Sequence, residues 1–273
     1  MAYARSGEVS LWYEVHGEDG PPLLLIEGLG YASWMWFKQV PAFSRFYRTI
    51  VFDNRGVGRS DKPDVPYSIP MMADDAAAVL DAVGIDCAHV LGYSMGSFIA
   101  QEFALRHPDR LGGLVLGGTS PGGPDVVIPG PEVIRAMTPD PDLPAEENIR
   151  RGLSVAARPG YYDSHSDERE AIVRFRLAEP TPVYAHRRQS EAAARHDTST
   201  RLGQIKAPTL VIVAEQDAVV PPANGFRVAQ AIPGAKVAVI PESGHHAFIE
   251  KASLFNQIVL EFLHGVDQEE GRA

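Results

Sequence analysis

The chain has 273 residues, 45% of them hydrophobic and 22% charged, and this ordinary globular composition excludes disorder, collagen and coiled coil. Its length predicts one large domain, or a domain with an insertion. The net charge of −10, without a basic run, makes nucleic acid and anionic membranes poor partners. A lone cysteine, Cys87, excludes an internal disulfide and multi-thiolate zinc sites, so we expect a reducing, cytoplasmic location.

Apolar runs in the sequence are short. The longest, such as residues 23–26 and 210–214, fall far below the ~20 residues that span a bilayer. Residues 1–10 hold no apolar core of a signal peptide. We therefore expect no membrane partner, and nothing in the sequence indicates an oligomeric state.

The first 120 residues alternate short apolar or β-branched runs with helical patterns. Residues 9–15 alternate in polarity and predict an edge strand, after which Pro21 and Pro22 break the chain. The elements expected next are strand 23–26, helix 33–44, strand 49–52, helix 71–83, strand 89–92, helix 96–107 and strand 111–116. Strands that alternate with helices favour an α/β fold with a mostly parallel sheet covered on both faces.

The pattern changes near Ser120. Glycines and prolines crowd the next stretch, and charged, helix-friendly segments without a buried strand follow as far as Ala194. We therefore expect residues 121–199 to form a helical cap inserted into a core made of residues 1–120 and 200–273. The core is expected to resume with strand 209–214, helix 223–231, strand 236–240 and helix 248–264, followed by a frayed polar tail.

Ligand sites in such folds lie at the carboxyl ends of the strands. After the third buried strand comes Gly92-Tyr93-Ser94-Met95-Gly96, which is G-x-S-x-G between a strand and a helix. The small flanking residues permit a tight turn that strains the serine and lifts its hydroxyl clear of the sheet. A glycine-rich turn with an incidental serine is the simpler interpretation, but this context favours a nucleophile.

A serine nucleophile needs a base, and the base needs a carboxylate that fixes its tautomer. His245 follows the last strand, with the adjacent His246 as the alternative. Asp217 follows the preceding strand, with Glu215 as the alternative. The order Ser94, Asp217, His245 is that of one class of catalytic triad. Of the other histidines, we expect structural roles for His89 and His107, and solvated positions in the cap for His165, His186 and His196.

An oxyanion formed at Ser94 needs two backbone donors. One is the N–H of Met95, and we expect the other to be the N–H of Leu29, in a glycine-flanked loop after the first buried strand. Residues 53–60 superficially resemble a phosphate loop but lack its G-K-[ST] ending, so we interpret them as a structural turn. No cluster of metal ligands is visible, and no metal or cofactor is expected.

On these motifs the chain resembles the α/β-hydrolase fold superfamily, and within it the 3-oxoadipate enol-lactonase and cofactor-free haloperoxidase-like ester hydrolases. The resemblance implies an eight-stranded, mostly parallel sheet with a helical cap after the sixth strand. It implies a triad of Ser94, Asp217 and His245, with Leu29 and Met95 as the oxyanion donors. The chain departs from the family in two places: Glu27 stands where histidine is usual, and Ser97 where glycine often follows the elbow.

The function expected on these grounds is that of a serine esterase or lactonase. It would cleave a small carboxylic ester or lactone through an acyl-enzyme intermediate. Two alternatives stay open. One is a non-catalytic or slow receptor for small molecules, and the other uses the same triad for carbon–carbon bond hydrolysis, lyase chemistry or perhydrolysis.

Glu27 poses an electrostatic problem for this function. An unpaired carboxylate ~6 Å from the oxyanion would cost about 3 kcal/mol at an effective dielectric constant of ~20. In the family's sheet the strands ending at Glu27 and Asp53 are neighbours, and the turn after the second carries Arg55. We therefore expect Glu27 to pair with Arg55 behind the oxyanion loop, the alternative being a carboxylate turned to solvent.

Overall fold

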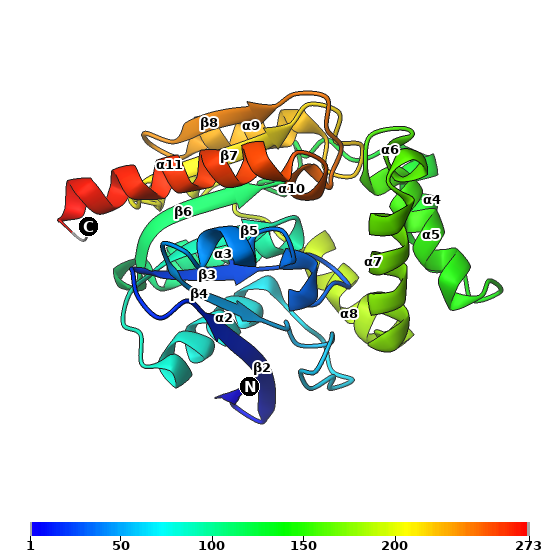
Figure 1. Cartoon of the computed structure of the whole chain (residues 1–273), viewed down its shortest axis with the longest axis horizontal. Coiled ribbons are helices and arrows are strands. Elements are labelled where there is room, and N and C mark those ends of the chain that lie inside the picture. Colours follow the sequence, from blue (N-terminus) through cyan, green and yellow to red (C-terminus); the bar gives the residue numbers. More distant parts are fainter. Residues whose placement is uncertain (1, 272–273) are drawn as a thin grey trace.

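A single eight-stranded sheet runs through the computed structural model, which describes residues 2–271 (Figure 1). Its strands are β1 (Ala2–Ser6), β2 (Val9–His16), β3 (Pro22–Ile26), β4 (Arg48–Phe52), β5 (Ala88–Tyr93), β6 (Leu111–Gly117), β7 (Thr209–Ala214) and β8 (Lys236–Ile240). They lie in the order β1-β2-β4-β3-β5-β6-β7-β8. β1 and β2 run antiparallel to their neighbours, and all other neighbouring strands are parallel, which confirms the expected mostly parallel sheet.

The outermost strand was not expected from the sequence. β1 pairs with β2 from Ala2 opposite Tyr13 to Ser6 opposite Val9, so β2 is not the edge strand that its alternation predicts. Of the residues of β1 only Ala4 is buried, so the segment carries almost no hydrophobic signal of its own. A tight turn at Gly7, with a φ of 58°, brings it back onto β2.

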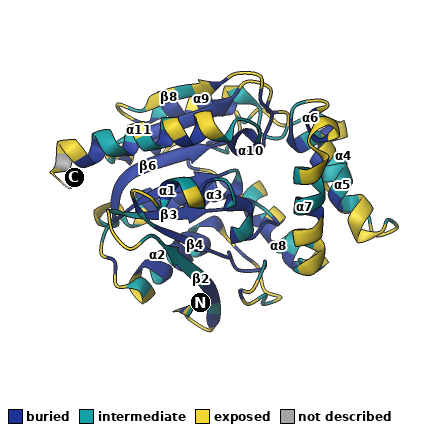
Figure 2. Cartoon of the chain, in the orientation of Figure 1, coloured by how far each residue is buried: buried dark blue, intermediate teal, exposed yellow. Residues whose placement is uncertain are grey.

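Helices cover both faces of the sheet, as the sequence predicts. α2 (Ile69–Val83), α3 (Met95–Arg106) and α9 (Pro222–Ala231) pack on one face, and α1 (Val40–Phe43) and α11 (Ala252–Glu270) on the other. In β3, Leu24 joins the first core and Leu23 and Leu25 the second, because successive side chains point to opposite faces. The inner strands β3 to β7 are accordingly buried along nearly all of their length, whereas β8 at the edge of the sheet is largely exposed (Figure 2). No helix within residues 2–271 is long and apolar enough to cross a membrane.

Two expected helices are divided in the structure. The segment 33–44 contains a 3₁₀ turn, η1 (Ser33–Trp36), and then α1. The last helix begins as α10 (Ala247–Glu250), breaks at Lys251 and continues as α11 to Glu270, well beyond the expected end. Its final turns are ordered by Asp267, which accepts hydrogen bonds from Tyr47 Oη and His89 Nε2, both at 2.9 Å. Tyr47 and His89 come from distant segments of the chain, so the polar sequence of the tail alone does not predict these contacts.

A helical insertion separates β6 from β7, as expected, and lies at one end of the sheet (Figure 1). Its helices are α4 (Pro131–Met137), α5 (Ala145–Ala156), α6 (Tyr161–Ser164), α7 (Ser166–Ala178) and α8 (Val183–Ala194). The two ends of the insertion meet, because Gly122 forms a β-bridge with Asp197 and the N–H of Thr198 donates to the carbonyl of Pro121 at 2.9 Å. On this junction we propose residues 121–199 as a cap domain over a core of residues 1–120 and 200–273. Two short 3₁₀ turns complete the core, η2 (Pro108–Arg110) and η3 (Leu202–Gln204).

Candidate active site

Ser94 occupies the sharp turn between β5 and α3. Its φ of 55° and ψ of −128° lie outside the conformations that residues with side chains favour. Glycines make the turn possible: a Cβ on Gly96 would lie 2.0 Å from the carbonyl oxygen of Ile26, and one on Gly92 would lie 2.2 Å from that of Gly96. The G-x-S-x-G pattern is therefore required by the close approach of β3, β5 and α3 beneath the serine.

Asp217 and His245 are in direct contact. Asp217 Oδ2 lies 2.8 Å from His245 Nδ1, and both residues are only 5% exposed. The other carboxylate oxygen accepts the backbone N–H groups of Val219 and Val220 at 2.9 and 2.8 Å. A carboxylate so fixed keeps the proton of a neutral imidazole on Nδ1, which leaves Nε2 free to act as a base.

Ser94 and His245 line the same small cavity, of about 30 Å³. Leu29 lines it as well, so the structure brings these three sequence-predicted residues together, with Asp217 behind His245. A second cavity of about 440 Å³ also reaches Ser94, and Met95 and Phe98 are among its mostly apolar lining residues. Ser94 is thus accessible from a narrow space and from a wider one.

His246 and Glu215, the alternatives for the base and the carboxylate, make other contacts. His246 Nδ1 lies 2.6 Å from the hydroxyl of Tyr162 in the cap. Burial, with the nearby His245 as a smaller cause, lowers the pKa of His246 well below its usual value, so its ring is neutral. Glu215 is exposed, and its Oε2 accepts the N–H of Glu242 at 2.9 Å.

The loop that carries Leu29 is held from two sides. Asn54 Nδ2 donates to the carbonyl of Glu27 at 2.9 Å. From α8 in the cap, Gln189 Oε1 accepts the N–H of Gly30 at 2.9 Å. Among residues 2–271, the N–H groups of Leu29 and Met95 donate to no other residue, so both are free for a ligand. Sequence reasoning missed Gln189, because a glutamine in a polar helix carries no distinguishing signal.

The expected ion pair between Glu27 and Arg55 is wrong. Arg55 Nε and Nη2 instead bind the two carboxylate oxygens of Asp75 in α2, at 2.5 and 2.6 Å. The alternative of a solvated carboxylate is wrong too, because Glu27 is only 3% exposed. Asp75 lies on the buried side of α2, and only helix packing brings it to Arg55.

Burial eases the electrostatic problem that Glu27 poses, because it disfavours the charged form of the carboxyl group. Burial raises the pKa of Glu27 well above its ordinary value, and the backbone N–H of Gly28 lowers it by less. A carboxyl group that resists ionisation carries little negative charge toward the oxyanion site. Its Oε2 atom is buried and has no hydrogen-bond partner among residues 2–271.

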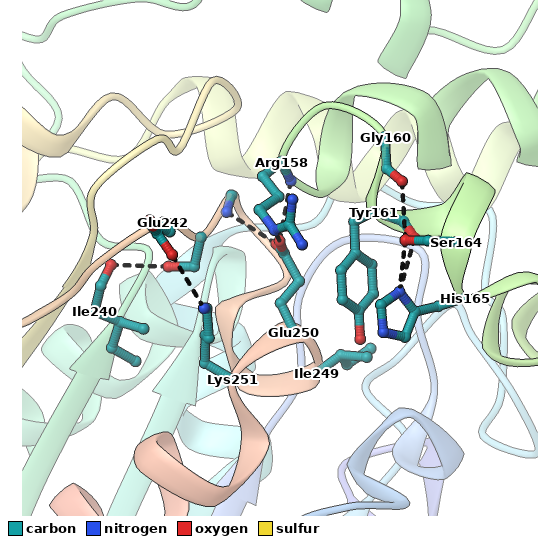
Figure 3. A network of polar contacts seen from close by, with 12 residues as sticks. Arg158, Gly160, Tyr161, Ser164, His165, Ile240, Glu242, Ile249, Glu250 and Lys251 are labelled. Carbon is teal, nitrogen blue, oxygen red and sulfur yellow. Dashed lines mark hydrogen bonds and ion pairs between the residues drawn. The ribbon is translucent and has the colours of Figure 1, made fainter.

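Glu250 ties the loop of the proposed base to the cap (Figure 3). It accepts the N–H groups of Gly244 at 2.9 Å and of Arg158 at 3.2 Å, and burial raises the pKa of its carboxyl group. Beside it, the N–H of His246 donates to the carbonyl of Ala156, the last residue of α5, at 2.6 Å. Sequence reasoning missed Glu250, whose partners are backbone groups of another segment.

A cationic side chain of the cap faces the oxyanion loop. The Arg176 guanidinium lies 4.8 Å from the centre of the Tyr31 ring, and with Leu29 both residues line a cavity of about 160 Å³. Arg176 forms no ion pair with a carboxylate within residues 2–271. In the same part of the chain, no group of three or more His, Cys, Asp or Glu side chains is arranged to hold a metal ion.

The fold and this arrangement define an α/β-hydrolase. The model of the alpha/beta hydrolase fold family matches residues 21–252, so the chain belongs to that family. The chain is 35% identical to a 2-hydroxy-6-oxononadienedioate/2-hydroxy-6-oxononatrienedioate hydrolase from Burkholderia vietnamiensis, over 94% of this chain and 91% of that protein.

Two solved structures have the same fold. An enol-lactonase from Burkholderia xenovorans LB400 superposes with a TM-score of 0.86 at 29% identity, covering 96% of this chain and 99% of its own. Est816, an N-acyl homoserine lactone degrading enzyme, gives a TM-score of 0.80 at 30% identity, covering 95% of this chain and 99% of its own. The family resemblance inferred from the motifs is thereby confirmed.

Proposed function

We propose that the chain is a serine hydrolase that cleaves a small carboxylic ester or lactone through an acyl-enzyme on Ser94. The contact of 2.8 Å between Asp217 and His245, beside a serine held in a strained turn, carries the proposal. Ser94 is the nucleophile, His245 the general base and Asp217 the residue that orients it. The N–H groups of Leu29 and Met95 stabilise the oxyanion.

The reaction follows from these positions. His245 Nε2 takes the hydroxyl proton of Ser94 as its oxygen attacks the substrate carbonyl. The negative charge that develops on the carbonyl oxygen is stabilised by the two free N–H groups, one of them at the N-terminus of α3. His245 returns the proton to the leaving alcohol, and water later releases the acyl group by the same steps.

A neutral ester or lactone suits the wider cavity at Ser94. Its lining is mostly apolar and includes Val133, Ile134 and Val220. Such walls favour a hydrocarbon chain or ring through burial of apolar surface. Of the two solved relatives, one is named an enol-lactonase and the other an N-acyl homoserine lactone degrading enzyme, and both names support this substrate class.

Hydrolysis of a carbon–carbon bond is a second candidate, favoured by Arg176. A half-buried guanidinium without a carboxylate partner in residues 2–271 is suited to bind an anionic group of a substrate. The relative from Burkholderia vietnamiensis is named for dicarboxylate substrates. An ester or a carbon–carbon substrate with a distal carboxylate fits the same position.

Covalent labelling tests the proposal. Treatment with an organophosphate is expected to add mass to the peptide that contains Ser94 and to abolish hydrolysis of p-nitrophenyl esters. Ser94→Ala is expected to be inactive and unlabelled. A panel of short esters, γ- and δ-lactones and carboxylated substrates then identifies the preferred class. Labelling elsewhere, or an active Ser94→Ala variant, contradicts the proposal, and a protein that hydrolyses none of the panel favours the receptor alternative.

A further inference from the structure

Glu27 lines the small cavity at Ser94, and one oxygen of its buried carboxyl group is unsatisfied within residues 2–271. The residue is 3% exposed, and its Oε2 has no hydrogen-bond partner within residues 2–271. Ser94 and His245 line the same cavity. A buried polar atom without a partner is unfavourable, so its presence beside the reacting groups calls for an occupant of the cavity.

The volume of this cavity limits which molecule it can hold. A space of about 30 Å³ has room for a water molecule, which needs at least 10–15 Å³ on the same measure and two to four polar partners. It is too small for an acyl chain. The cavity of about 440 Å³ that also reaches Ser94 is the place for the organic part of a substrate. Water and substrate therefore have separate spaces around one serine.

We propose that Glu27 positions the water that hydrolyses the acyl-enzyme, a role that rests on the proposed function of Ser94. The water donates one hydrogen to His245 Nε2 and the other to Glu27 Oε2. Both hydrogens are then engaged, and an oxygen lone pair faces the acyl carbon. Fixing the water in this way supplies the orientation that a bimolecular attack lacks.

The bonds and protons of this step are accounted for by the water, Ser94 and His245. The water oxygen bonds to the acyl carbon while one of its protons passes to His245. The tetrahedral intermediate then expels Ser94 Oγ, which regains the proton from His245. The second water hydrogen leaves on the carboxylic acid product. The raised pKa of Glu27 fits this role, because a neutral carboxyl accepts the hydrogen bond without opposing the charge on the oxyanion.

Two variants separate this role from a structural one. Glu27→Gln retains an oxygen acceptor in nearly the same shape, whereas Glu27→Met retains the length of the side chain and removes the acceptor. Formation of the acyl-enzyme does not use the water, so only its breakdown is affected. With p-nitrophenyl acetate in stopped flow, we expect Glu27→Met to keep the burst of p-nitrophenol and kcat/KM, while kcat falls roughly tenfold or more. Glu27→Gln is expected to stay within a few-fold of the wild type.

Competition with an alcohol gives an independent readout. Methanol carries a single hydroxyl hydrogen, which it gives to His245, so its attack on the acyl-enzyme does not need Glu27. In mixtures of water and methanol, we expect Glu27→Met to yield a higher ratio of methyl ester to free acid than the wild type. Glu27→Gln is expected to keep the wild-type ratio. Glu27→Ala is a second variant without the acceptor and is measured in the same way if Glu27→Met does not fold.

Specific results would overturn the assignment. If kcat and kcat/KM fall together in Glu27→Met and the burst disappears, Glu27 acts in acylation or in the shape of the oxyanion loop. An unchanged partition ratio also refutes a role for Glu27 in binding water. A wild-type enzyme that never acylates Ser94 refutes the proposed function itself, an outcome distinct from both of these.

Discussion

At Asp217, a substitution can keep the shape of the side chain and change only its effect on the His245 ring. Asp217→Asn keeps an oxygen for the N–H groups of Val219 and Val220 but presents an N–H₂ group to His245, which favours the tautomer that cannot act as a base. We expect an unchanged fold and a fall in kcat of about 10⁴-fold. Ester hydrolysis measures kcat, and circular dichroism measures the fold. Glu215→Gln is the matched control, and an inactive Glu215→Gln variant would show that the wrong carboxylate has been assigned.

Substitution of Arg176 tests whether the substrate carries a negative charge. If it binds a carboxylate, Arg176→Gln is expected to raise KM for substrates with a distal carboxylate by roughly ten- to hundredfold, the effect of losing a charge-assisted hydrogen bond of about 1.5–3 kcal/mol. The KM of neutral esters is expected to stay unchanged. Arg174→Gln is the control, because Arg174 lies on the same helix and is exposed. Equal changes for charged and neutral substrates would assign Arg176 to the structure of the cap.

At the scale of elements, Glu250 couples the cap to the loop after β8. Its two oxygens accept one backbone N–H from each side, Gly244 from the loop and Arg158 from the cap. Glu250→Gln replaces one acceptor by a donor that faces an N–H group, so we expect a lower melting temperature and a several-fold loss of kcat. Steady-state kinetics and thermal unfolding measure the two effects.

Glu242 supplies the control for this prediction. Its ion pair with Lys251, at 3.7 Å, lies on the surface in the same region (Figure 3). Exposed ion pairs contribute little to stability, so Glu242→Gln is expected to resemble the wild type. Equal losses in Glu242→Gln and Glu250→Gln would mean that the charge of the region, rather than the bridge, is important.

At the scale of the whole molecule, a buried histidine makes stability depend on pH. His196 was expected to be solvated, but it is 6% exposed and stacks on Phe98, with ring centres 4.6 Å apart. Burial lowers its pKa from 6.5 to about 4. Between these values the unfolded chain binds a proton that the folded chain does not, so the free energy of unfolding falls as the pH drops from 6.5 toward 4.

Thermal unfolding between pH 7 and 4.5 tests this dependence. His196→Gln keeps a hydrogen-bond donor for Gln101, whose Oε1 lies 3.3 Å from His196 Nε2, but has no titrating group. We therefore expect its melting temperature to fall less steeply with acidification than that of the wild type. Parallel curves for the two proteins would show that His196 does not contribute to the acid sensitivity.

The sequence by itself determined the local helices and strands and the places along the chain where the candidate catalytic residues lie. Apolar runs and helical patterns predicted the buried strands, and the glycines around Ser94 indicated a strained turn. Parallel strands gather their carboxyl ends at one edge. The residues after three of those strands were therefore expected to converge. The structure places Asp217 against His245, and His245 lines a cavity together with Ser94.

Only the tertiary structure decided which side chains meet across distant segments. Asp75 on α2, rather than Glu27, binds Arg55. Gln189 and Glu250 hold loops through backbone groups that no sequence pattern marks. The same packing buried Glu27 without a cationic partner, and this burial raises the pKa of its carboxyl group. These outcomes depend on how helices dock onto the sheet, because the charge state and partner of a buried group are set by what surrounds it in space.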